Sequence, residues 1–155
     1  MILGIEPHRG KELTGRRMYQ FAENFYKDLG PLSHLPFEIF FRRVADMPYR
    51  CDDDLFPEDP RKIVEVVARP AHLLNSSIFP GLDCKKKSVL LGAWSAANGR
   101  PFRFLAVSER PDGKIHHVFP DIDLLGRGWT SADATFQKNK IGQVFPLTFA
   151  EELQR

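Results

Sequence analysis

Apolar side chains recur every three or four residues between Arg16 and Leu29, which is the period of one face of an amphipathic helix. The residues on this face are Met18, Phe21, Ala22, Phe25, Tyr26 and Leu29. We expect a helix here, with Thr14 as its N-cap and Gly30-Pro31 as its stop. In this interpretation the face packs on the core, and residues 1–15 form an irregular arm.

The next apolar segment, Phe37–Tyr49, does not distinguish helix from strand by its pattern alone. We predict a helix for its first half and extended chain over Met47–Arg50. The acidic run Asp52–Asp54 could supply half of a metal site, but no second ligand cluster lies near it in the sequence, so a solvated loop is predicted. Asp59-Pro60 then has the pattern of a helix start and predicts a short helix over Arg61–Ala68.

A loop is expected over Ala71–Phe79, and it leads to the central helix of the chain. Asp83 is a good N-cap, and the run up to Ala97 is rich in leucine, alanine and tryptophan. Asn98-Gly99 supplies the C-terminal stop. The residues expected to face the core are Leu90, Leu91, Trp94 and Ala97.

Three strands are predicted after this helix. Pro101–Glu109 alternates between two faces, and Pro111–Lys114 contains the Pro-Asp-Gly signal of a hairpin turn. Ile115–Ile122 is the return strand, and Trp129–Asp133 is the third strand. The tail, Ala134–Arg155, either adds an edge strand or covers the core. The elements together predict an α+β fold, with N-terminal helices and the central helix packed on an antiparallel sheet.

The length of 155 residues is that of a single domain. We divide it into a helical arm (residues 1–36), a core (about 37–135) and a tail (136–155). A hydrophobic fraction of 43% and a charged fraction of 27% are ordinary for a soluble globular protein. Two cysteines do not make a disulfide framework, which favours a reducing compartment.

Charge and hydropathy exclude several classes of partner. The net charge of +2 argues against nucleic acid or an anionic membrane as the main partner. No apolar run approaches the roughly 20 residues that cross a bilayer. Residues 1–17 lack the apolar segment of a signal peptide, which predicts a cytoplasmic location and leaves later association with a virion open.

The first candidate for chemistry is Cys84, in the first turn of the central helix. The unpaired amides and the positive end of the helix dipole favour a thiolate there and can bind an oxyanion. Lys85–Lys87 add positive charge close by. The alternative is an inert, packed cysteine, and position alone does not decide between the two.

His116 and His117 lie on the predicted return strand, where successive side chains point to opposite faces. Asp133 lies sixteen positions beyond His117 on the next strand, and a hairpin of this length can place the two side chains together. A helix-borne thiol, a strand-borne imidazole and a neighbouring carboxylate are a recurring arrangement for activating cysteine. The alternation of the strand does not say which histidine faces Cys84.

Four short motifs stand in a fixed order along residues 70–135. They are Asp83-Cys84, Gly99-Arg100-Pro101-Phe102-Arg103-Phe104, His117-Val118-Phe119, and Trp129 followed by Asp133-Ala134-Thr135. Each motif is weak by itself, but the ordered set resembles the core of the transglutaminase-like superfamily. The resemblance implies the papain-like core that these cysteine enzymes share.

The resemblance also implies roles for the candidate residues. Cys84 would be the nucleophile, His117 the base and later the acid, and Asp133 the residue that orients the imidazole. His117 is preferred because Val118-Phe119 follows it, and His116 is the alternative base. The backbone amide of Cys84 would be one oxyanion donor. In this family a second donor comes from a side chain upstream of the cysteine, and the candidates here are His72, Asn75 and Tyr49. Neither a metal nor a cofactor is expected.

This chain departs from the family pattern at three places. Leu82 separates Gly81 from Asp83-Cys84, and Lys85–Lys87 follow the cysteine where acidic residues are common in the family. Pro120 suggests a sheet edge or an early strand end. The lysines make an acidic or phosphate-bearing substrate conceivable, but we expect a solvated first turn.

The leading functional hypothesis is an amide-bond hydrolase or transamidase that acts through a thioester on Cys84. Its substrate would be a protein, a peptide or a peptidoglycan-type amide, and compact members of the family suggest a phage or bacterial source. The alternative is a non-catalytic binding or structural module of the same fold, such as a virion component. A nucleic-acid binder that uses Arg42-Arg43 and Lys85–Lys87 is disfavoured, because the basic residues are scattered.

Overall fold

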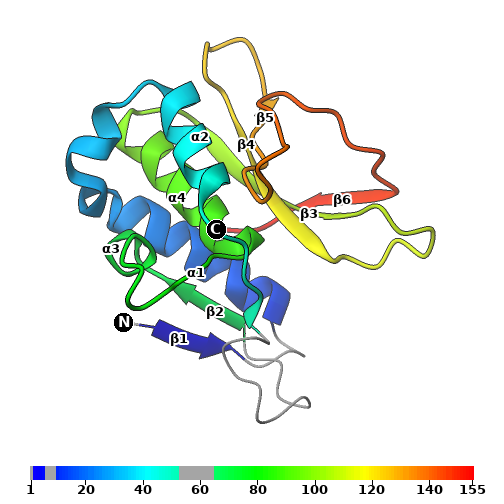
Figure 1. Cartoon of the computed structure of the whole chain (residues 1–155). Coiled ribbons are helices and arrows are strands. Elements are labelled where there is room, and N and C mark those ends of the chain that lie inside the picture. Colours follow the sequence, from blue (N-terminus) through cyan, green and yellow to red (C-terminus); the bar gives the residue numbers. More distant parts are fainter. Residues whose placement is uncertain (1, 6–9, 53–64) are drawn as a thin grey trace.

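A layer of helices packs against a four-stranded antiparallel sheet, so the fold is mixed α+β as predicted (Figure 1). The computed structural model describes residues 2–5, 10–52 and 65–155. A second, two-stranded sheet lies at the end of the helical layer where the chain begins (Figure 1). One hydrophobic core joins buried residues from the helices and from both sheets.

The larger sheet has the strand order β5-β4-β3-β6. Its strands are β3 (Phe102–Ser108), β4 (His117–Ile122), β5 (Thr130–Ser131) and β6 (Phe149–Glu152). The three strands predicted after the central helix are therefore present, and the tail adds an edge strand at β6. The predicted hairpin turn joins β3 to β4, and Gly113 adopts the positive φ of 70° that such a turn requires.

The expectation that the strand ends at Pro120, or lies at a sheet edge there, is wrong. β4 continues to Ile122 and is paired on one side with β3 and on the other with β5. The missing N–H is tolerated because β5 is only two residues long and the neighbouring chain bonds to the proline's carbonyl: Ala132 N donates to Pro120 O at 2.9 Å.

The central helix α4 (Cys84–Ala97) is buried along most of its length. The predicted cap is confirmed, because the Asp83 side chain accepts a hydrogen bond from the amide of Lys86 at 3.1 Å. Gly92 allows the close approach of the sheet, since a Cβ there would lie 2.8 Å from the Phe104 ring. α4 thus forms the middle of the molecule, with the sheet on one side and other helices on the other (Figure 1).

The N-terminal region differs from the prediction. α1 (Gly10–Asn24) starts earlier than expected, so Thr14 lies inside the helix with a buried hydroxyl and is not an N-cap. The expected stop at Gly30-Pro31 lies within a 3₁₀ segment, η2 (Tyr26–His34), where Gly30 has a φ of 52°. β1 (Ile2–Ile5) replaces part of the irregular arm, because it pairs with a distant strand.

That partner is β2 (Glu65–Ala68), antiparallel to β1 with Ile2 opposite Ala68. The prediction of a helix over Arg61–Ala68 is therefore wrong for β2, where two β-branched residues, Val66 and Val67, are buried in a sheet. Residues 61–64 and the expected start at Asp59-Pro60 lie outside the described residues.

The segments between η2 and α4 follow the prediction more closely. α2 (Phe37–Asp46) is the helix expected in the first half of its segment, and the chain is non-helical over Met47–Arg50. α3 (Pro70–Leu73) places one helical turn at the start of the loop expected between Pro70 and Pro80.

Candidate active site

The residues just before α4 form backbone hydrogen bonds with the segment that follows α2. Leu82 N donates to Pro48 O at 2.9 Å, and Arg50 N donates to Leu82 O at 3.4 Å. Gly81 permits this contact, because a Cβ at that position would lie 2.7 Å from Cβ of Arg50. The pairing fixes the approach to Cys84 and brings residues 49–52 alongside the start of the helix.

His117 and Asp133 form the centre of the site. The Nε2 atom of His117, the first residue of β4, lies 2.7 Å from Oδ2 of Asp133. Asp133 follows β5, which pairs with β4, so the sheet itself brings the two side chains together. The other carboxylate oxygen, Oδ1, accepts the amide of Thr135 at 3.0 Å, and the Asp133 residue is only 3% exposed.

A hydrogen bond to Cys84 is among the contacts that raise the pKa of His117, so the thiol lies close to the ring. Because Nε2 is bound to Asp133, Nδ1 is the nitrogen left for the sulfur. Ser88, one helical turn after Cys84, donates to the carbonyl of Val118 at 3.4 Å and fixes α4 against β4. The side chains of Cys84, His117 and Asp133 therefore form a continuous line of polar contacts.

The electrostatics of these groups support each other. Burial disfavours the charged imidazole, but hydrogen bonds to Asp133 and Cys84, together with their negative charges, raise the pKa of His117 to about 10. Burial also opposes ionisation of Asp133. The hydrogen bond and positive charge of His117, together with hydrogen bonds from the side chain and backbone of Thr135, nevertheless hold the pKa of this carboxyl below its usual range. The arrangement favours the protonated form of the His117 ring.

We expect a titration of the His117 ring, followed by NMR, to give a pKa of about 10. Since an unfolded histidine titrates near pH 6.5, this group stabilises the folded protein fully below about that pH. The contribution is lost as the pH rises through the folded pKa of about 10. Cys84→Ala, which removes the hydrogen bond to the thiol, should lower the folded pKa of His117. A wild-type value near 6.5, unchanged in Cys84→Ala, would contradict this account.

The alternative base, His116, does not take part in this arrangement. Its backbone amide donates to Val107 O at 3.1 Å, and its Nε2 accepts the amide of Glu109 at 3.0 Å. The residue is exposed, and its ring is used to close the hairpin between β3 and β4. His116, the alternative to His117, therefore bonds the backbone of the hairpin, while His117 bonds the Asp133 carboxylate.

Among the side-chain candidates for a second oxyanion donor, Tyr49 lies near the thiol. Burial is the largest cause of the raised pKa of its phenol. The hydrogen bond to Cys51 and the negative charges of Cys51, Cys84 and Asp83 raise this pKa further. Cys51 Sγ lies 3.3 Å from the Tyr49 hydroxyl, within hydrogen-bonding distance, and the tyrosine ring packs against Phe136, with 5.2 Å between the ring centroids.

The two other candidates have different surroundings. His72 lies near Asp28. The pKa of the Asp28 carboxyl is held low mainly by its hydrogen bond to Arg69, which outweighs burial. The Ala71 amide and the charges of Arg69 and His72 lower it further. Asn75 accepts the amide of Ser77 within its own turn at 3.0 Å. The first candidate, the backbone amide of Cys84, begins α4 and has no acceptor within the helix.

The lysines after Cys84 are not a solvated first turn. Lys86 is fully buried and pairs with Asp52 and, at 3.2 Å, with Asp83. Lys85 pairs with the same two carboxylates, at 3.2 Å from Asp52 and 2.6 Å from Asp83. Lys87 is also buried. The prediction failed because the acidic partner arrives from a distant part of the chain.

The expected solvated acidic loop is wrong at Asp52 for the same reason. This carboxylate is buried, and its Oδ2 accepts the amide of Val66 at 2.9 Å. Asp53 and Asp54 lie outside the described residues. The one local signal for the charge cluster is the spacing of Asp83 and Lys86, an acid and a base three positions apart on one helical face.

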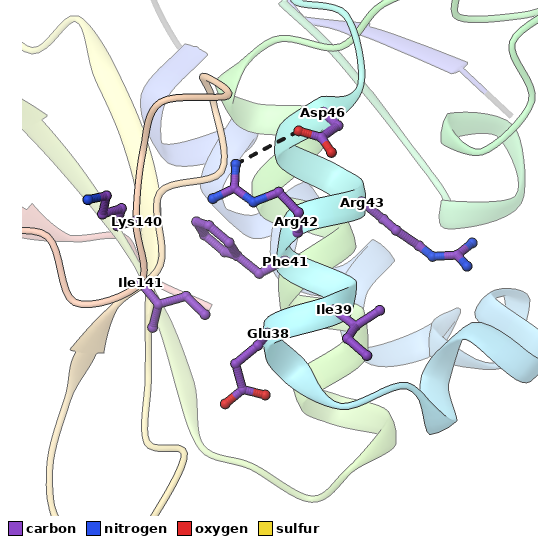
Figure 2. A pocket seen from close by; sticks show the side chains of 8 residues that line it. All are labelled: Glu38, Ile39, Phe41, Arg42, Arg43, Asp46, Lys140 and Ile141. Atoms are coloured by element: carbon purple, nitrogen blue, oxygen red, sulfur yellow. Dashed lines mark ion pairs between the residues drawn. The ribbon is translucent and has the colours of Figure 1, made fainter.

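A hollow of about 530 Å³ lies between α2 and the chain at Lys140-Ile141 (Figure 2). Arg42 crosses from α2 toward this chain segment and donates to the carbonyls of Gln137 and Asn139. Figure 2 also shows its ion pair with Asp46, at 3.8 Å. None of the three residues of the polar contact lines this hollow, so it is separate from the site at Cys84.

Within residues 2–5, 10–52 and 65–155, no three histidine, cysteine or acidic side chains gather as metal ligands would. No helix in the same ranges has the length and apolar character needed to span a bilayer.

Comparison with protein-family models gives no match for this chain, and comparisons with curated proteins and with solved structures give none either.

Proposed function

We propose that this protein is a thiol enzyme of the transglutaminase-like type, which acts on amide bonds through a thioester on Cys84. The observation that carries the proposal is the position of His117, between a thiol at a helix start and the buried carboxylate of Asp133 at 2.7 Å. This is the arrangement that activates a cysteine for attack on a carbonyl.

The first half of the proposed reaction forms the thioester. The Cys84 thiolate attacks the carbonyl carbon of the amide, and the carbonyl oxygen becomes an oxyanion. His117 then donates its proton to the leaving nitrogen, the carbon–nitrogen bond breaks, and a neutral amine departs. Asp133 keeps the ring oriented and stabilises its charged form throughout.

In the second half, neutral His117 removes a proton from a water molecule or from a second amine, which attacks the thioester. The carbon–sulfur bond breaks and returns the thiolate of Cys84 beside the imidazolium. Water gives hydrolysis, and an amine gives transamidation.

Two groups are placed to stabilise the oxyanion in this proposal. The amide of Cys84 is one, and the hydroxyl of Tyr49 is the other. The raised pKa of the Tyr49 phenol keeps its proton available for donation.

The architecture supports the same proposal. A helix that begins with the cysteine packs on an antiparallel sheet, with the histidine on one strand and the aspartate after the next. This is the order expected for a papain-like core, in which we place the chain. The substrate is proposed to be a protein or peptide. Burial of Lys86 and Lys87 removes the reason to consider an acidic or phosphate-bearing substrate.

The proposal predicts selective labelling of Cys84 by iodoacetamide at about pH 6, where an ordinary thiol near its usual pKa of about 8.5 reacts slowly. Mass spectrometry of the labelled peptides should find Cys84 modified well before Cys51. His117→Ala should slow the labelling of Cys84 toward the rate of Cys51.

Cys51→Ala is the matched control, since it should leave labelling at Cys84 in place. Equal rates at the two cysteines in the wild-type protein would remove the case for an activated thiol. That result would favour the non-catalytic binding module.

A further inference from the structure

Lys87 is a buried cation that the proposed reaction does not use. It lies on α4 three residues after Cys84, and only 1% of the residue is exposed. Its ammonium donates to the carbonyls of Ala45 at 3.2 Å, Met47 at 2.6 Å and Thr135 at 3.0 Å. An ammonium has three N–H donors, so each is used in bonding the main chain.

The three carbonyls belong to two segments far from Lys87 in the sequence. Those of Ala45 and Met47 lie at the carboxyl end of α2, where the last carbonyls lack helical partners and carry partial negative charge. The third belongs to Thr135, in the loop that carries Asp133. One side chain from the helix of Cys84 therefore ties α2 to this loop.

The bond to Thr135 continues to the imidazole. The amide of Thr135 donates to Asp133 Oδ1 at 3.0 Å, and Oδ2 of the same carboxylate lies 2.7 Å from His117 Nε2. The order of contacts is the Lys87 ammonium, the Thr135 peptide groups, the Asp133 carboxylate and the His117 ring. The helix that carries the thiol thus also restrains the carboxylate that orients its base.

We propose that Lys87 is a positioning residue, which holds the Asp133 carboxylate against His117 through Thr135. This inference rests on the proposed function for its catalytic meaning. Lys87 does not touch the thiol or the substrate in this scheme and acts through Thr135 and Asp133.

The ionisation of Lys87 agrees with such a role. Burial lowers the pKa of Lys87 to about 8, and the negative charges of Asp133 and Asp46 limit the fall. Lys87 is therefore mostly charged at neutral pH, when all three of its N–H groups are available to the carbonyls.

The test compares Lys87→Met, which has no donor, with Lys87→Gln, which keeps two. Arg42→Met is the matched control, because Arg42 also donates to carbonyls of the same chain segment, but at Gln137 and Asn139. Two signals are measured at pH 6 in protein with ¹⁵N-labelled histidine. One is the NMR resonance of the His117 Nε2 proton, and the other is the rate of Cys84 labelling by iodoacetamide.

Lys87→Met should broaden or shift the His117 resonance and slow the labelling of Cys84 by about 10- to 100-fold, the size expected from a small displacement of a positioned group. Lys87→Gln should fall between this variant and the wild type, and Arg42→Met should stay within about twofold of the wild type on the same argument.

A folded Lys87→Met protein with the wild-type resonance and rate would overturn the proposal, as would equal losses in Arg42→Met. If Lys87→Met does not fold, Lys87→Gln decides by the same criteria. If Cys84 in the wild type proves no more reactive than Cys51, the proposed function fails, but the His117 resonance still tests whether Lys87 positions Asp133.

Discussion

Asp133→Asn should reduce turnover of an acyl substrate by roughly 10³- to 10⁴-fold, the effect of replacing the orienting carboxylate in a triad of this type. The asparagine oxygen can still accept the amide of Thr135, so the loop is retained. Its NH₂ group, however, would donate to His117 Nε2, which is the nitrogen that donates in the wild type. The ring would then carry its proton on Nδ1, facing Cys84, and could not serve as a base.

The rate of nitrophenol release from p-nitrophenyl acetate measures this effect. Asp121→Asn is a suitable control, since Asp121 is a buried carboxylate on β4 that pairs with Arg103 at 2.9 Å and not with His117. A loss of the same size in both variants would mean that general damage to the sheet, and not the bond to His117, causes the effect. A loss below about tenfold in Asp133→Asn would contradict the assigned role.

Lys86→Met should lower the free energy of unfolding by about 3–5 kcal/mol, which is typical when one member of a buried ion pair is removed. Lys86 is fully buried between Asp52 and Asp83. Without it, two buried carboxylates repel each other, and only the partly exposed Lys85 remains between them. Urea denaturation followed by circular dichroism measures the change.

Adding Asp52→Asn to Lys86→Met should recover part of the lost stability, because it removes one uncompensated charge and keeps an oxygen for the Val66 amide. Lys85→Met should cost less than Lys86→Met, because Lys86 still contacts both carboxylates. A loss below about 1 kcal/mol in Lys86→Met would show that water or relaxation stabilises the carboxylates, against the expectation for a buried pair.

The parts of the fold that could be predicted have local signals. The start of α4 follows from the side chain of Asp83, its end from Asn98-Gly99, and the β3–β4 hairpin from Pro-Asp-Gly. β1 and β2 have no such signals, because each becomes a strand only by pairing with the other from a distant part of the chain. Asp59-Pro60 favoured a helix over Arg61–Ala68, but the pairing of β2 with β1 makes its end a strand.

The candidate site divides in the same way. His117 and Asp133 could be placed together from sequence, because a short run of strands and turns connects them. The surroundings of Lys86 and Lys87 could not, since Asp52 and the end of α2 reach α4 only through tertiary packing. A run of three lysines ordinarily faces solvent, but here Lys86 and Lys87 are buried and bind the helix of Cys84 to Asp52 and to the end of α2.

The edge strand β6 has a consequence for self-association. Within the described chain it pairs only with β3, so its outer side presents backbone groups that can template a further strand. Glu151 and Glu152 lie on this strand, and two copies that joined along it would bring four carboxylates, two from each, into one short ribbon. We infer that these charges discourage edge-to-edge aggregation of the protein.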